Sequence, residues 1–133
     1  MATKLISKYL GDDRVEITHG PTGEKIITDL PPDNGGKGRA FSPTDLAAAS
    51  LSSCILTIMA VMARRDKINI DGAEIEIEKQ MRETPRRIGE FTGKIKFPAG
   101  VSSVDRKKLM MVLKACPVTG SLHPDIKVEL AEE

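Results

Sequence analysis

The first third of the chain alternates between apolar and polar positions. Val15 and Ile17 share one face of an extended segment, and their neighbours are polar. The sequence Gly-Pro-Thr-Gly at 20–23 predicts a turn, and residues 24–28 resume the extended pattern. We therefore expect an antiparallel hairpin, joined by an earlier strand near 4–10.

A long segment without charged residues follows, from Leu46 to Ala63. Ser42 is a suitable N-cap, Pro43 suits the first helical position, and Asp45 favours the positive end of a helix. These features predict a helix to about Arg64. Its length approaches that of a membrane span, but small polar residues interrupt it, so we expect a helix buried on nearly all sides.

Two further strands are predicted after this helix. Residues 73–78 alternate isoleucine and alanine with glutamate, residues 84–87 break the pattern, and residues 93–97 alternate again. Such a pair is typical of a second hairpin. A final strand is expected at 126–130.

A second helix should begin at Ser102 or Ser103. Its apolar positions follow the spacing of a core-facing stripe: Leu109, Val112, Leu113 and Cys116. Pro117 disfavours helical geometry at the residue before it, so the helix is predicted to end at Cys116.

This order of elements predicts an α+β fold with antiparallel sheets and helices packed on one side, in a single domain of residues 1–133. The long helix is apolar on every face, and a chain of 133 residues has little material to surround it. We therefore expect a homodimer in which a partner subunit covers the second face. Residues 31–38 are rich in glycine and proline and predict a flexible, candidate functional loop.

Composition excludes several classes of function. The chain has 20 basic and 19 acidic residues, a net charge of +1, 3% aromatic residues and no tryptophan. This balance argues against nucleic acid or an anionic membrane as partner. The first residues show no signal-peptide pattern, so a cytoplasmic location is expected.

Cys54 and Cys116 are the only cysteines, far fewer than in a disulfide-stapled secreted domain. One interpretation is a reactive thiol with a resolving thiol, and another is two inert buried side chains. A metal site formed with His19 and His123 lacks the close ligand pairs that zinc sites use. A cysteine hydrolase with His123 as base has no supporting signature. No metal or cofactor is expected.

A reactive thiolate needs nearby positive charge to lower its pKa. Arg14, at the start of the first hairpin, and Arg39, in the glycine-rich loop, are the candidates for this role. The alternative for each is a surface residue that only aids solubility.

Two segments around the cysteines resemble a known family. The sequence SPTDLAAASLSSC at 42–54 is similar to the first cysteine motif of the OsmC/Ohr family, and CPVTGSL at 116–122 to the second. The resemblance spans essentially the whole chain. It implies an α+β fold made as an intertwined homodimer, with the cysteine helix at its centre and two active sites at the subunit interface.

The resemblance also implies an activity. Characterised members of the family are thiol peroxidases that reduce organic hydroperoxides. By motif, Cys54 is then the thiol that attacks the peroxide and Cys116 the thiol that resolves the sulfenic acid to a disulfide. Arg14 matches the early arginine of the Ohr branch, and Arg39 the later loop position of the OsmC branch. The implied reductant is a dithiol of the dihydrolipoyl type.

One position departs from the family pattern. The peroxidases have glutamate directly after the proline of the first motif, where it holds the arginine, whereas this chain has Thr44 followed by Asp45. Threonine forms no ion pair, so Asp45 is the carboxylate left for this role. The chain therefore looks closer to a divergent OsmC-like branch. The second functional hypothesis is a non-catalytic dimer that binds a small ligand in the interface cleft or acts in stress response.

Overall fold

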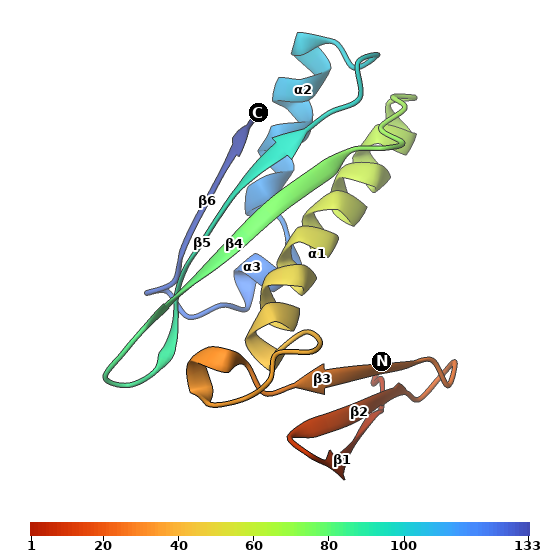
Figure 1. The fold of residues 1–133 in the computed structure, drawn as a ribbon. Helices are drawn as coiled ribbons and strands as arrows, with labels where there is room; N and C mark the ends of the chain where they lie inside the picture. The colour runs from red at the N-terminus through yellow and green to blue at the C-terminus, as the bar shows by residue number, and fades with distance from the viewer. The chain divides into compact units, whose positions relative to one another are not determined.

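The computed structural model describes all residues from 1 to 133. The chain forms two compact units, Met1–Leu46 and Ala47–Glu133. The strands and helices of both units are drawn in Figure 1. The expected α+β class is confirmed, and the single domain stays a prediction.

The first unit contains a three-stranded antiparallel sheet of order β1-β2-β3. Its strands are Leu5–Gly11, Arg14–His19 and Lys25–Asp29. The turn between β2 and β3 is closed by the Gly23 N–H, which donates to the His19 carbonyl at 2.7 Å. The predicted hairpin and the earlier strand are both confirmed.

The loop after β3 is tied to itself by backbone hydrogen bonds. It contains a 3₁₀ turn, η1, at Pro32–Asn34. The Gly36 N–H donates to the Pro31 carbonyl at 2.9 Å, and the Gly38 N–H donates to the Leu30 carbonyl at 3.0 Å. A side chain at Gly36 would collide with the Leu30 carbonyl, so this turn requires glycine. The segment predicted to be flexible is therefore a compact turn.

Helix α1 runs from Pro43 to Arg65 and begins as the sequence predicts. The Asp45 N–H donates to Ser42 Oγ at 3.0 Å, and the Ser42 N–H donates to Asp45 Oδ2 at 2.9 Å. This reciprocal pair is a capping box with aspartate in place of glutamate.

In the single chain, α1 buries one face, and burial of the second face by a partner subunit stays a prediction. The buried residues recur every three or four positions: Ala48, Leu51, Ile55, Met59 and Ala63. Ser50, Ser53, Thr57 and Val61 form an exposed stripe. Helix α1 is long and apolar enough to cross a membrane by length and composition, a test that a core helix also passes.

The second unit contains a sheet of order β4-β5-β6, with strands Glu74–Arg82, Arg87–Lys96 and Lys127–Glu132. Strands β4 and β5 pair antiparallel, with Ile75 opposite Ile95. Strand β6 pairs parallel to β5, so this sheet is mixed rather than purely antiparallel. The reason is the connection, because a crossover containing helices returns the chain to the same end of the sheet (Figure 1).

The predicted second helix is broken into three pieces: α2 at Ser103–Met110, η2 at Met111–Lys114 and α3 at Pro117–Gly120. Ser102 is its N-cap, and Ser102 Oγ accepts from the Asp105 N–H at 3.1 Å. The α-helix stops at Met110, and Cys116 has an extended backbone, as the residue before a proline prefers. Cys116 therefore starts α3 rather than ending α2.

The core of the second unit lies between the sheet and the helices. Phe91, Ile95, Leu109 and Val112 are buried there together with the inner face of α1. Cys116 belongs to this core, and Cys54 packs against it. The fold thus brings together two cysteines that are far apart in the sequence.

Candidate functional site

The two cysteines come from different helices of the second unit. Cys54 lies within α1 and is partly exposed, whereas Cys116 is the N-cap of α3 and is only 1% exposed. Both cysteines are free thiols, and each influences the pKa of the other. The sequence alone does not predict this interaction, since only the folded chain creates it.

Burial raises the pKa of the Cys54 thiol, and the interaction with Cys116 raises it further. The backbone N–H of Val118 acts in the opposite direction. Cys54 therefore holds its proton more strongly than an ordinary cysteine.

Cys116 behaves differently. Burial acts to raise the pKa of Cys116, but polar interactions outweigh burial, so its pKa is lowered. They come from the Cys54 thiol, from the backbone N–H and hydroxyl of Thr119, and from the backbone N–H of Val118. Although Cys116 is the N-cap of α3, its sulfur accepts no capping hydrogen bond. Of the two thiols, Cys116 is the one that ionises first.

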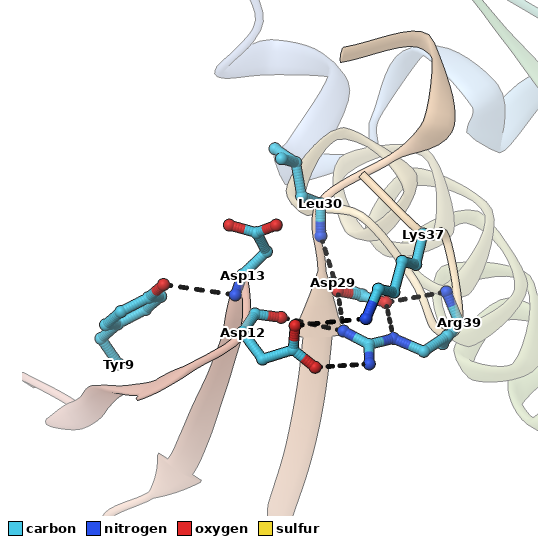
Figure 2. A network of polar contacts seen from close by, with 7 residues as sticks. All are labelled: Tyr9, Asp12, Asp13, Asp29, Leu30, Lys37 and Arg39. Carbon is cyan, nitrogen blue, oxygen red and sulfur yellow. Dashed lines mark hydrogen bonds and ion pairs between the residues drawn. The ribbon is translucent and has the colours of Figure 1, made fainter. Parts of the chain in front are cut away.

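Arg39 is held within the first unit by two aspartates (Figure 2). Its Nε donates to Asp29 Oδ2 at 2.7 Å, and one terminal nitrogen donates to Asp29 Oδ1 at 3.1 Å. The other terminal nitrogen donates to Asp12 Oδ2 at 2.8 Å. The backbone N–H of Arg39 also donates to Asp29 Oδ2, at 2.8 Å. Lys37 contributes a weaker contact to Asp12 at 3.4 Å.

This network has a clear electrostatic consequence. Hydrogen bonds from the Arg39 side chain lower the pKa of Asp29 far below its usual range, and those from Arg39 and Lys37 lower the pKa of Asp12. The same bonds to Asp29 and Asp12 raise the pKa of Arg39. The Asp29 side chain is fully buried, and Asp29 lies at the end of β3. Arg39 therefore fastens its loop to the sheet.

Arg14 is the first residue of β2 and pairs in register with Asp29 of β3. Its Nε is buried without a hydrogen-bond partner. Asp45 belongs to the capping box of α1. The predicted site residues Arg14, Arg39 and Asp45 lie in the first unit, and both cysteines lie in the second. The role of an arginine in activating Cys54 stays a prediction.

The two histidines lie in different surroundings. His19 Nδ1 is 2.7 Å from Thr22 Oγ1, and His123 Nδ1 is 3.7 Å from Asp125 Oδ2. No group of three or more His, Cys, Asp or Glu side chains is arranged to hold a metal ion.

Sequence reasoning missed two residues of these clusters. Thr119 acts to lower the pKa of Cys116, and its position three residues after Cys116 in a short helical turn was the available signal. Asp29 is the last residue of β3 and precedes a Leu-Pro-Pro segment, where a carboxylate at a strand end is easily taken for a solvated residue. Its partner Arg39 is ten residues further on, beyond the reach of any local pattern.

Comparison with known proteins places this arrangement in a family. A sequence model of OsmC-like proteins matches residues 35–131. The chain is 31% identical over 103 residues to ACIAD3023 of Acinetobacter baylyi, an uncharacterized protein, covering 75% of this chain and 71% of that protein. The chain therefore belongs to the OsmC-like protein family.

Solved structures agree with this assignment. A protein of Psychrobacter arcticus, named as a candidate osmotic stress induced and detoxification response protein, superposes with a TM-score of 0.93 and 41% identity, covering 100% of this chain and 97% of that one. The organic hydroperoxide resistance protein OsmC of Legionella pneumophila superposes with a TM-score of 0.80 and 18% identity, covering 100% of this chain and 97% of that one. The organic hydroperoxide resistance protein OhrB of Bacillus subtilis superposes with a TM-score of 0.72 and 19% identity, covering 100% of this chain and 98% of that one. The last two show a shared fold.

Proposed function

We propose that this protein is a thiol peroxidase that reduces organic hydroperoxides, with Cys54 as the nucleophile and Cys116 as the resolving thiol. The observation that carries the proposal is that the fold gathers the two motif thiols at one core, one partly exposed and one buried, where each affects the pKa of the other. Such a pair supports oxidation to a disulfide without a metal or cofactor. The names of the Legionella and Bacillus structures, which refer to organic hydroperoxide resistance, point to the same substrate class.

The chemistry runs in two steps. The Cys54 thiolate attacks the terminal oxygen of the hydroperoxide, the O–O bond breaks, and the alkoxide takes a proton to leave as an alcohol. Cys54 is then a sulfenic acid. Cys116 attacks its sulfur, the S–S bond forms, the S–O bond breaks, and water leaves. An external dithiol, of the lipoyl type by family resemblance, reduces the disulfide and completes the cycle.

Accessibility decides which sulfur attacks the peroxide. Cys116 is the more acidic thiol, but at 1% exposure it offers no surface to a substrate. Cys54 is the partly exposed member of the pair, and Cys116 acts to raise its pKa. Because interacting thiols titrate as a pair, an ionised Cys116 can take the Cys54 proton as attack begins.

We further propose that the protein acts as a homodimer in the cytoplasm. The exposed stripe of α1 carries hydroxyl groups that already bond within the helix: Ser50 Oγ donates to the Ala47 carbonyl at 2.7 Å, and Thr57 Oγ1 to the Cys54 carbonyl at 2.9 Å. A partner can therefore cover this stripe without leaving these hydroxyls unsatisfied. A second copy of the chain is the proposed partner.

We expect sedimentation velocity to give twice the mass of one chain, and Thr57→Glu to shift the protein to monomer because it places a charge in the middle of the contact. Lys107→Glu, at an exposed position on α2, is the matched control and should leave the dimer intact. A monomeric wild-type protein at micromolar concentration would exclude this part of the account.

The direct test of the proposed activity is steady-state turnover. Reduced protein with cumene hydroperoxide and dihydrolipoamide should consume peroxide continuously, and omission of the dithiol should limit consumption to about one equivalent per chain. The same assay with hydrogen peroxide tests the preference for organic substrates. Consumption no faster than in buffer with dithiol alone would contradict the proposal.

One observation favours the second candidate, a non-catalytic dimer that binds a small ligand. Burial raises the pKa of Cys54, which is opposite to the shift that an activated thiol needs. The pH dependence of Cys54 alkylation separates the two candidates. In the native protein, a thiol that reacts only at alkaline pH would favour the ligand-binding alternative, and one that reacts near neutral pH the peroxidase.

A further inference from the structure

The hydroxyl of Thr119 is an unusual group beside the core. Its Oγ1 is buried and has no hydrogen-bond partner, and Thr119 lies in the short helical turn that Cys116 begins. Its side chain acts to lower the pKa of Cys116. Buried polar groups nearly always have a partner, and one that lacks a partner requires an explanation. The nearby Ser121 hydroxyl shows the ordinary arrangement, since it donates to the Pro117 carbonyl at 2.8 Å.

The local backbone fixes where this hydroxyl lies. Cys116 has an extended conformation before Pro117, and the Gly120 N–H donates to the Cys116 carbonyl at 3.0 Å. Thr119 is thereby placed at the third position after the N-cap, where a side chain can reach back towards the capping residue. Its backbone N–H and its hydroxyl both act on the same sulfur.

The chemistry of sulfur supplies the missing partner. A neutral thiol is a weak acceptor, whereas a thiolate accepts strong, charge-assisted hydrogen bonds. The Thr119 hydroxyl is therefore poorly satisfied while Cys116 is protonated and well satisfied once Cys116 ionises. The hydroxyl thus favours the ionised state of a buried sulfur that is otherwise costly to charge.

We propose that Thr119 is a positioning residue that stabilises the Cys116 thiolate, and so keeps the resolving sulfur in the form that attacks oxidised Cys54. This inference rests on the proposed peroxidase function for its purpose. In that step the Cys116 thiolate attacks the sulfur of the Cys54 sulfenic acid, the S–S bond forms and the S–O bond breaks. The departing hydroxide takes up a proton and becomes water.

The test measures ionisation of Cys116 without peroxide. In a Cys54→Ser background, which keeps a hydroxyl donor at that position, the ultraviolet absorbance of the thiolate is followed against pH. Thr119→Val keeps the shape of the side chain and removes the hydroxyl. We expect it to raise the pKa of Cys116 by roughly 1, the effect of one hydrogen bond to a charged group. Thr119→Ser should restore the wild-type titration.

Two controls separate this role from a structural one. Thermal unfolding of Thr119→Val should match that of the parent, because the Thr119 hydroxyl has no hydrogen-bond partner while Cys116 is protonated. Lys114, an exposed cation two residues before Cys116, is replaced by glutamine and should change the titration less, since solvent screens it. Thr119→Ala is measured in parallel, so that a folding defect in one variant does not decide the outcome.

An unchanged titration in Thr119→Val and Thr119→Ala would overturn the inference. Failure of Thr119→Ser to restore the titration, or a Lys114→Gln effect as large as that of Thr119→Val, would do the same. A protein without peroxide turnover that still shows the Thr119-dependent titration would overturn the proposed function and leave the role of Thr119 in thiolate stabilisation standing.

Discussion

Replacing Cys54 with serine is expected to lower the consumption of cumene hydroperoxide by at least about 10³-fold, as removal of a reacting nucleophile does. A serine hydroxyl is not ionised at neutral pH and forms no sulfenic acid. Turnover with an excess of a dithiol is the measurement. Lys107→Gln, at an exposed position on α2 outside the proposed dimer contact, is the control and should keep wild-type turnover.

Cys116→Ser should fail at a different step. The first oxidation remains, so one equivalent of peroxide is consumed and a sulfenic acid at Cys54 accumulates that dimedone traps. The opposite pattern, with the sulfenic acid on Cys116 in a Cys54→Ser protein, would reverse the assignment of the two thiols. That outcome is a real alternative to test, because the pKa of Cys116 is the lower of the two.

The second large effect is expected from Asp29→Asn. This substitution removes the buried negative charge that accepts three hydrogen bonds from Arg39 and leaves the guanidinium facing an amide. Removing one partner of such a pair is strongly destabilising. We expect the thermal unfolding temperature at neutral pH to fall by several degrees. Asp71→Asn, at an exposed turn position, should leave it unchanged.

The same pair predicts a dependence on pH. The folded-state pKa of Asp29 is depressed below the ordinary value of 3.8, so its contribution to stability is fully present above that value. It is lost as the pH falls through the folded-state pKa. The wild-type unfolding temperature should therefore drop more steeply than that of Asp29→Asn below about pH 4. Parallel curves would show that the Asp29–Arg39 pair does not stabilise the fold.

Local patterns in the sequence predicted the local structure well. Ser42 and Asp45 signalled the start of α1, and the structure confirms the start through their reciprocal hydrogen bonds. The alternation around Val15 and Ile17 predicted the first hairpin, and register pairing confirms it. Each of these features depends on residues within a few positions of one another, where turn chemistry and side-chain period decide the outcome.

Features that depend on distant residues were not predictable in this way. One local feature also differed, because the apolar stripe from Leu109 to Cys116 has helical spacing but is completed by a 3₁₀ turn, with an extended backbone at Cys116 before Pro117. The interaction of Cys54 with Cys116 and the pairing of Arg39 with Asp12 arise only when the chain folds. Motif resemblance gave the cysteines their proposed roles, and the fold brought them together.

The most direct test of the account is a titration of the reduced wild-type protein with one equivalent of cumene hydroperoxide and no reductant. Peptide mapping by mass spectrometry then follows the two cysteines. The account predicts that both thiols disappear together and that one cross-linked peptide pair joins Cys54 to Cys116. Unchanged thiols, or a Cys54 sulfinic acid formed while Cys116 stays free, would contradict it.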